Sequence, residues 1–382
     1  VVATFHSLGT RGVGVSACQG VGMTWGGEPS GRRLGLGVRF AHASCRGSLF
    51  AVAALMLVVS VPVAAQQTHV VVVTGLSGDS EYADQFHEWA TTLIDVAIER
   101  YELPAENVTY LAEKTERNPD RIDGRSTRDN VEATLIAVAD RAAPSDHVLV
   151  LLIGHGSYQN GESRFNLPGR DLTAEDYARL LDPLGSQRVS FVNTATASGG
   201  FIEALSGEGR TVVTATRSGG QWNETVFGGY FVAAYASGEA ESDQNRDGRV
   251  SVLEAFQYAV AQVARVYESD GRLQTEHALL DDNGDKEGTR EPDPLTTDGA
   301  LARTLFISAG EGAGMAGWPD DPALRALYQE RLELQEQIEA LQATRGGTDE
   351  TRYQAELEKL LVAIALKGRE IRDAEAADDS PR

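Results

Sequence analysis

Short apolar segments alternate with longer amphipathic segments along most of the chain. The runs at 69–75 (HVVVVTG) and 147–153 (HVLVLLI) are aliphatic and rich in valine, which is typical of strands buried on both faces of a sheet. This alternation predicts an α/β domain at 69–310, with a mainly parallel sheet flanked by helices. The other expected elements are strands at 107–111, 188–194 and 211–216 and helices at 80–101, 127–142, 174–184, 201–205, 226–237 and 252–268.

A different pattern begins after Pro322. Leu324, Leu327, Leu334, Ile338 and Leu341 follow heptad spacing that Arg331 interrupts, and a second apolar series at 353–364 follows a Gly-rich turn. These two series predict a C-terminal α-helical hairpin over 320–372, which packs within the chain or against a second copy of it. The acidic segment 373–382 is expected to be a disordered tail.

The longest apolar run of the chain lies near its start, in a segment with the pattern of a leader peptide. Residues 49–65 are apolar, follow Arg39 and Arg46, and end in small residues, so they indicate a signal peptide cleaved near Ala65 and export to the periplasm or beyond. A membrane anchor fits less well, because about 20 apolar residues are needed to span a bilayer and Pro62 interrupts the run. Residues 1–65 are therefore interpreted as upstream sequence and signal peptide.

The leader also changes the composition. It contains both cysteines, Cys18 and Cys45, so the mature chain has no thiol. It carries five Arg and one Glu, and its removal takes the formal net charge from −22 to −26. This acidity excludes a nucleic-acid-binding role and favours divalent cations.

Residues 243–254 (DQNRDGRVSVLE) match the EF-hand calcium-loop pattern at every constrained position. The alternative is an Asx-rich turn that binds no ion. A second stretch, 281–285 (DDNGD), lacks a terminal Glu in register and is interpreted as a surface turn with room for an extra cation. The predicted Ca²⁺ ligands are Asp243, Asn245, Asp247, the carbonyl of Arg249, Ser251 and Glu254.

Three polar or Gly-rich segments leave the predicted strands at one edge. They are 154–157 (GHGS), 194–200 (TATASGG) and 214–218 (TATRS), and ligands bind at that edge of parallel sheets. No zinc site is expected, because no pair among the mature histidines outside this edge has zinc-ligand spacing. Those histidines are His69, His87, His147 and His277.

The segments 151–157 (LLIGHGS) and 191–200 (FVNTATASGG) resemble the caspase/legumain group of cysteine peptidases, over roughly residues 70–280. In that group a strand-end His pairs with a Cys in a small-residue turn, and N–H groups of the Gly after His and of the Cys form the oxyanion hole. The resemblance assigns His155 and Gly156 to the His-Gly pair. It places Thr196 where the Cys belongs, and it makes 214–218 the wall of a specificity pocket.

This replacement leaves the question of enzymatic activity open, because a Thr hydroxyl needs a strong adjacent base to act as a nucleophile. The favoured interpretation is an inactive homologue that binds a peptide or protein in the cleft, since the sequence names no acid that would orient His155. The alternative is a peptidase or esterase in which His155 activates Thr196 or Ser198. A third is a calcium-stabilised assembly or adhesion module that self-associates through the hairpin.

Overall fold

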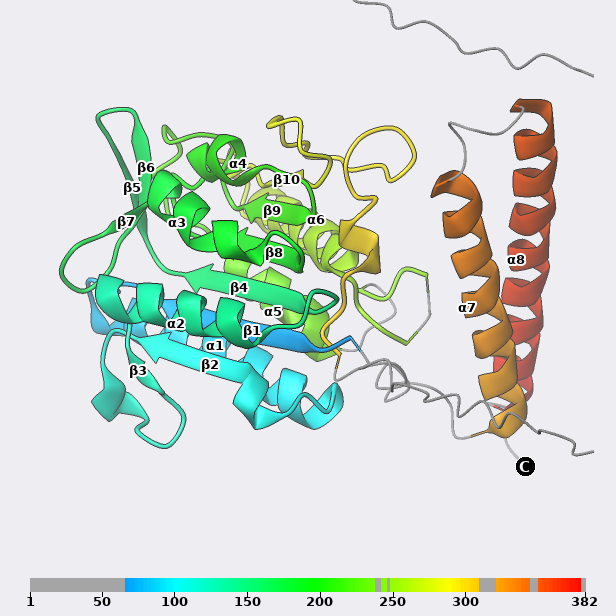
Figure 1. Ribbon diagram of the computed structural model, residues 1–382, viewed down its shortest axis with the longest axis horizontal. Helices are drawn as coiled ribbons and strands as arrows, with labels where there is room; N and C mark the ends of the chain where they lie inside the picture. The colour runs from blue at the N-terminus through cyan, green and yellow to red at the C-terminus, as the bar shows by residue number, and fades with distance from the viewer. Residues whose placement is uncertain (1–65, 238–241, 246–247, 309–320, 344–349, 379–382) are drawn as a thin grey trace, which may run out of the picture. The chain divides into compact units, whose positions relative to one another are not determined.

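The computed structural model describes residues 66–237, 242–245, 248–308, 321–343 and 350–378. Its main sheet has the strand order β10-β9-β8-β4-β1-β2-β3; β10 runs antiparallel to β9 and all other neighbours are parallel (Figure 1). The strands are β1 (Thr68–Thr74), β2 (Val108–Ala112), β3 (Gly124–Arg125), β4 (His147–Ile153), β8 (Arg188–Asn193), β9 (Arg210–Thr214) and β10 (Leu279–Asp281).

Helices cover both faces of this sheet and create two apolar cores. One core lies between the sheet and α1, α5 and α6, and the other lies between the sheet and α2, α3 and α4. The fold is therefore α/β with a mostly parallel sheet, as predicted. The helices are α1 (Ser80–Asp95), α2 (Arg128–Arg141), α3 (Ala174–Leu181), α4 (Gly200–Leu205), α5 (Phe227–Ser237) and α6 (Val252–Ser269), and short turns η1 (Val96–Arg100) and η4 (Asp182–Leu184) extend α1 and α3.

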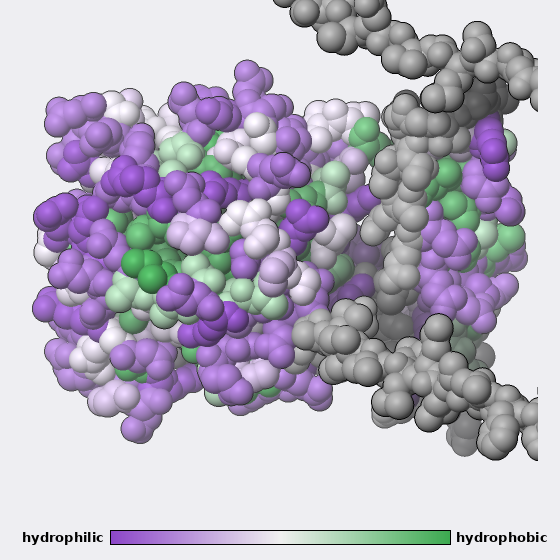
Figure 2. All heavy atoms as spheres, viewed as in Figure 1, coloured by the Kyte–Doolittle hydropathy of each residue, from purple (hydrophilic) through white to green (hydrophobic). Residues whose placement is uncertain are grey.

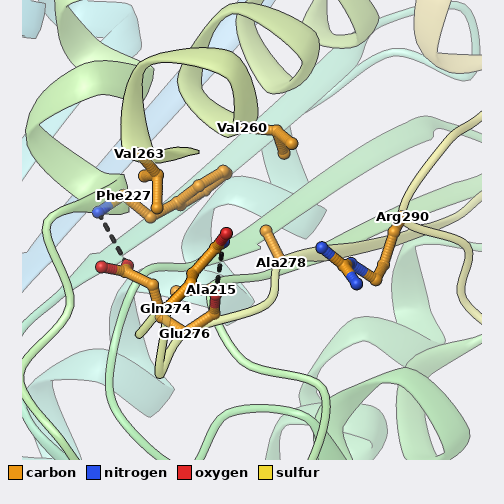
Figure 3. A pocket seen from close by; sticks show the side chains of 8 residues that line it. All are labelled: Ala215, Phe227, Val260, Val263, Gln274, Glu276, Ala278 and Arg290. Carbon is orange, nitrogen blue, oxygen red and sulfur yellow. Dashed lines mark hydrogen bonds between the residues drawn. The ribbon is translucent and has the colours of Figure 1, made fainter. Parts of the chain in front are cut away.

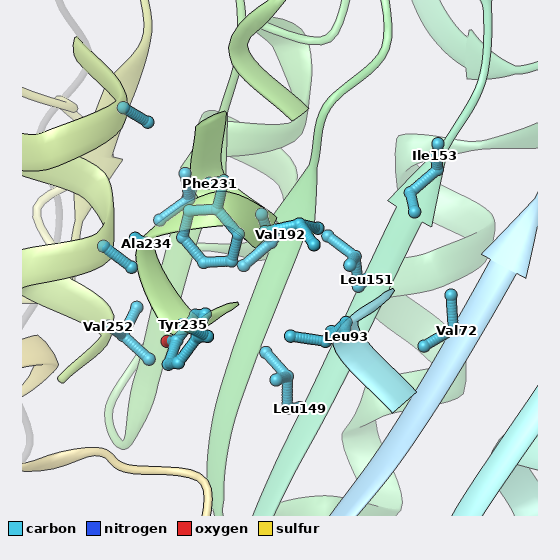
Figure 4. Packing of buried hydrophobic residues seen from close by; sticks show 14 of the residues in the cluster. Val72, Leu93, Leu149, Leu151, Ile153, Val192, Phe231, Ala234, Tyr235 and Val252 are labelled. Carbon is cyan, nitrogen blue, oxygen red and sulfur yellow. The ribbon is translucent and has the colours of Figure 1, made fainter. Parts of the chain in front are cut away.

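Strand β1 shows why the central strands are continuously apolar. Successive side chains of a strand point to opposite faces. Val70 and Val72 enter the core beneath α1, and Val71 and Val73 enter the core beneath α2. Figure 4 shows this packing on the α1 side, where Val72 lies in the same cluster as Leu93 and residues of the neighbouring strands.

A small antiparallel sheet leaves the carboxyl end of β4. It consists of β5 (Gly156–Gln159), β6 (Glu162–Phe165) and β7 (Leu172–Thr173). Asn160 and Gly161 connect β5 to β6, and both have positive φ, 56° and 88°. Asn-Gly is the preferred pair for a tight hairpin of this type.

The hairpin at the C-terminus consists of α7 (Pro322–Ala343) and α8 (Glu350–Asp378). Leu324 and Tyr328 of α7 pack with Ile371 of α8, and the guanidinium of Arg331 lies 5.0 Å from the centre of the Tyr328 ring. The apolar series that Arg331 interrupts thus continues through a cation–π contact.

The predicted disordered tail is wrong at its start. Helix α8 continues to Asp378, whereas the tail was expected to begin at 373. Ala and Glu dominate 374–377, and both are strong helix formers that extend an existing helix. Residues 379–382 lie outside the described part of the chain.

The described surface is rich in polar residues, as expected for a strongly acidic chain. The face in Figure 2 is mostly hydrophilic, with a limited apolar area between the regions where Figure 1 draws α2 and α3. Among the described residues no helix is both long and apolar enough to cross a membrane. The predicted signal peptide lies outside those residues.

A polar cluster is buried at the amino ends of β1 and β4. His69 Nε2 lies 3.0 Å from Asp146 Oδ2. His147 Nδ1 lies 3.1 Å from the Phe306 carbonyl and its Nε2 lies 2.9 Å from Ser190 Oγ. Because a carbonyl only accepts, Nδ1 carries a proton and donates it, and in the neutral ring Nε2 accepts the Ser190 hydroxyl. Burial lowers the pKa of His147 to about 4.

This depressed pKa predicts a loss of stability in acid. The unfolded chain protonates His147 below about pH 6.5, whereas the folded chain resists until about pH 4, so the contribution is complete above pH 6.5 and is lost between these values. The loss should reach about 3 kcal/mol. In urea unfolding from pH 7.5 to 4.0, the non-titrating variant His147→Gln should be less stable at pH 7.5, and the difference should shrink toward pH 4. A difference that stays constant contradicts this prediction.

Candidate functional site

The candidate site lies where the order of connections in the sheet reverses. From β1 the chain moves to β2 on one side, whereas β4 pairs with β1 on the other side. The loop after β1 and the loop after β4 therefore diverge at the carboxyl edge, which is where α/β sheets bind ligands. Gly75 N–H donates to the Ile153 carbonyl at 2.9 Å and joins these two strand ends.

His155 emerges from this edge, half-buried between two aromatic rings of α1. Its ring centre lies 4.7 Å from that of Tyr82 and 5.2 Å from that of Phe86, both in edge-on arrangements. Burial lowers the pKa of His155, while the Ser77 backbone, Glu224 and Asp79 oppose this shift. The imidazole is therefore neutral at pH 7 and has the protonation state of a base.

Tyr82 and Glu224 form the rim beside His155. The hydrogen bond between them is the main cause that raises the pKa of Tyr82 to about 12. Tyr82, Phe86 and Glu224 were not among the residues predicted for this site. The spacing of four residues between Tyr82 and Phe86 on a helix was the available signal, but it equally fits a helix face in the core.

Thr196 lies next to Gly156, as the predicted cleft requires, but its hydroxyl is occupied. Thr196 Oγ1 donates to the Gly156 carbonyl at 2.9 Å and accepts the Gly156 N–H at 3.0 Å. Within the described residues no hydrogen bond joins the His155 ring to Thr196 or Ser198. The hydroxyl is thus held by backbone groups and not by a base, and it covers the N–H that an oxyanion hole would use.

Glycine is required at position 156 because two backbone segments meet there. A Cβ atom at Gly156 would lie 2.2 Å from the Thr196 carbonyl oxygen and 2.9 Å from that of Arg164. Both contacts are with backbone, which cannot move aside like a flexible side chain. The His-Gly pair thus allows the turn at 194–200 to approach the start of β5.

Ser198 is buried and bonded within the same turn. Its Oγ lies 3.1 Å from Thr216 Oγ1 and accepts the Thr216 N–H at 3.2 Å. Ala197, between the two hydroxyl residues, has a φ of 52°, a left-handed conformation that strains a non-glycine residue. Its N–H donates to the Gln221 carbonyl at 2.8 Å. Ser198 therefore ties the turn to the predicted wall at 214–218 and has no access to a substrate.

Glu276 holds the start of α5. It is 1% exposed and accepts the N–H groups of Val226 and Phe227 at 3.1 Å, so it caps the start of α5 (Figure 3). Burial raises the pKa of Glu276 despite these bonds. The adjoining cavity, about 10 Å³ in volume, has no room for a ligand. Glu276 was not among the residues predicted for this site.

The predicted calcium loop connects α5 to α6. Gly248 has a φ of 82° and donates its N–H to Asp243 Oδ2 at 2.8 Å. Asn245 N–H donates to Glu254 Oε1 at 3.2 Å, and Ser251 and Glu254 form a capping box at the start of α6. The first and last predicted ligands thus point into one turn, and their oxygens suit a hard cation.

Asp247 and Arg249 are two further predicted ligands of this loop. Asp247 lies outside the described residues. The Arg249 side chain stacks 4.0 Å above the Phe306 ring, which is compatible with its predicted role through the carbonyl. Where the chain is described, no three His, Cys, Asp or Glu side chains gather closely enough to hold a metal ion.

A second acidic group surrounds the end of β10. Asp281, Asp282 and Asp298 are 1%, 8% and 2% exposed. Burial, together with the charges of Asp281, Asp282 and Asp285, raises the pKa of Asp298 to about 6, although the Asp282 N–H opposes this shift. The stretch at 281–285 was interpreted as a surface turn, yet its first two carboxylates are buried.

The chain matches no protein-family model and no curated protein. The structure itself establishes an α/β fold with a mostly parallel sheet and converging turns at its carboxyl edge.

Proposed function

We propose that this chain is an exported, calcium-binding homologue of the caspase/legumain peptidases that lacks thiol catalysis and binds a peptide or protein segment at the cleft around His155. The observation that carries this proposal is the pair of hydrogen bonds between Thr196 Oγ1 and the Gly156 backbone. A nucleophile needs a base within hydrogen-bond reach and a free oxyanion hole. Here the Thr196 hydroxyl is held away from the His155 base, and it occupies the Gly156 N–H that an oxyanion hole would use.

The same bonds argue against the hydroxyl-dependent hydrolase. Activation of Thr196 by His155 would require breaking the bond that its hydroxyl donates to the Gly156 carbonyl, and activation of Ser198 would require exposing a side chain that is 1% exposed. Catalytic hydrogen bonds are often long in unliganded enzymes, but these hydroxyls have short alternative partners. Hydroxyl catalysis would show as wild-type turnover that depends on His155.

Peptide binding is supported by the rim of the cleft. The loop 217–225 carries Trp222, which is 76% exposed, and its Gly219 lies against the ring of Tyr158, which is 51% exposed. Gln221 and Glu224 of the same loop contact Ala197 and Tyr82. Exposed aromatic rings beside a cleft are typical of peptide-recognition surfaces.

The substitution Thr196→Cys tests the cleft. The mature chain should not hydrolyse fluorogenic peptides or esters in the presence of calcium. Thr196→Cys should acquire peptide hydrolysis, because a thiol bonds more weakly to Gly156 and ionises more easily than a hydroxyl. Adding His155→Ala should abolish the acquired activity. The control Ser198→Cys places a thiol in the same turn but away from Gly156, and it should stay inactive. Wild-type turnover that His155→Ala removes would overturn the inactive assignment.

The calcium loop is tested by Glu254→Gln. Calorimetric titration of the mature chain with CaCl₂ should give a binding heat from this loop, and the substitution should weaken that component at least about tenfold, because it removes the bidentate carboxylate. Gln retains the side-chain length and acceptor oxygen for the Ser251 bonds. Glu268→Gln, a change on the same helix far from the loop, should leave the heat unchanged. An unchanged titration of Glu254→Gln contradicts the calcium assignment.

A second candidate function, self-assembly through the hairpin, is favoured by an apolar stripe on α8. Leu361, Val362 and Leu366 are 49%, 53% and 56% exposed, although α7 covers another side of the same helix. Such a stripe is typical of a helix that packs against another helix.

Light scattering tests this assembly. If the stripe pairs with a second copy, the mature chain should be a dimer and Leu361→Glu with Leu366→Glu should make it a monomer, because charges would enter the apolar contact. The control Glu358→Gln changes a polar neighbour and should leave the dimer intact. A monomeric wild-type chain contradicts the assembly role and leaves the cleft proposal unaffected.

A further inference from the structure

We propose that Asp281 and Asp298 form a second binding site for a divalent cation, Ca²⁺ or Mg²⁺, separate from loop 243–254. This site would lie beside loop 206–209, which leads into the amino end of β9 and is therefore remote from the carboxyl edge that holds His155. The two carboxylates come from different segments, the end of β10 and the loop before η5 (Ala302–Thr304).

Asp281 supplies the first observation. It is 1% exposed, and its Oδ1 accepts the Gly284 N–H at 3.2 Å. Its Oδ2 is buried and has no hydrogen-bond partner. A buried carboxylate oxygen without a donor is costly, because it loses hydration and gains nothing in return. Asp281 therefore presents an oxygen that requires a ligand.

The surrounding backbone holds this oxygen in place. Leu280 and Thr289 exchange two backbone hydrogen bonds, of 2.9 and 2.8 Å, which close the loop that follows Asp281. Gly284 in this loop approaches Gly207, and the Lys286 N–H donates to Ser206 Oγ at 3.0 Å. Because the loop is fixed at both ends and on its side, Asp281 cannot swing into solvent without disrupting the loop.

Asp298 supplies the second carboxylate. It is 2% exposed, and its Oδ1 accepts the Asp282 N–H at 3.2 Å, so it lies against the residue that follows Asp281. No described Lys, Arg or His forms an ion pair with either side chain. Two buried carboxylates close together repel each other, and a cation between them would offset this repulsion.

The neighbouring Asp282 is not part of the proposed site. Its Oδ1 accepts the Gly299 N–H at 2.7 Å, and its Oδ2 accepts the N–H groups of Leu301 and Ala302 at 2.8 Å. Both oxygens are thus used to cap η5. This role also fixes the loop that carries Asp298.

The chemistry of the pair indicates a hard divalent cation. Ca²⁺ and Mg²⁺ prefer carboxylate oxygens and complete their coordination with carbonyl and water oxygens. Because no three acidic, His or Cys side chains gather in the described residues, the two carboxylates would share the ion with such oxygens. The exposed carboxylate of Asp285 lies in the same loop and adds negative potential there.

The experiment isolates this site in the Glu254→Gln background, where the calcium loop is disabled. The mature Glu254→Gln chain is titrated with CaCl₂ and separately with MgCl₂, and its thermal midpoint is measured with each. It should still bind one cation and gain thermal stability. Adding Asp281→Asn should remove both effects. Adding Glu287→Gln, which removes one exposed charge from the same loop, should leave both effects intact.

The outcomes are distinguishable. If Glu254→Gln shows neither binding heat nor a rise in thermal midpoint with either cation, the site does not exist. The same conclusion follows if Asp281→Asn leaves cation binding unchanged, because the cation would then bind at another place. If Asp281→Asn does not fold, Asp298→Asn replaces it in the same comparison. Binding that Glu254→Gln leaves unchanged but Asp281→Asn abolishes supports this site and overturns the calcium loop.

Discussion

The parallel pairing of β1, β4 and β8, buried on both faces, is the constraint on which the rest of the structure depends. These strands run in register from His147 beside Thr68 to Leu152 beside Asn193, so they end at one edge. The loops that follow them must emerge together there. Thr196 and the His155-Gly156 pair thus meet because the strands before them end at the same edge, and this proximity alone says nothing about catalysis.

The contact between Thr196 and Gly156 decides what this edge can do. A thiol at the same position would be a larger, weaker hydrogen-bond partner, whereas a hydroxyl forms two short bonds with the glycine backbone. Those bonds stabilise the turn that Ala197 strains with its positive φ. In this structure Thr196 thus acts as part of the scaffold that joins the turn at 194–200 to the start of β5.

The parts of this structure that depend on periodicity could be predicted from the sequence, and those that depend on contacts could not. The strand at 147–153 and the helices around it follow from apolar spacing alone. The hairpin β5–β6 was missed although Asn160 and Gly161 signal it, because its strands are short and polar. The occupied hydroxyl of Thr196, the cap by Glu276 and the burial of Asp281 each arise between segments distant in sequence, which no local pattern encodes.

Helix α5 links the cleft to the predicted calcium loop. At its start, Glu276 caps the N–H groups of Val226 and Phe227, and Thr225 donates to the Thr194 carbonyl at 2.6 Å. At its end, Ser237 lies six residues before Asp243. A cation that orders loop 243–254 would thus restrain the same helix that supports the turn carrying Thr196. Binding energy gained at the loop would stabilise the folded cleft by mass action, without any change in the cleft itself.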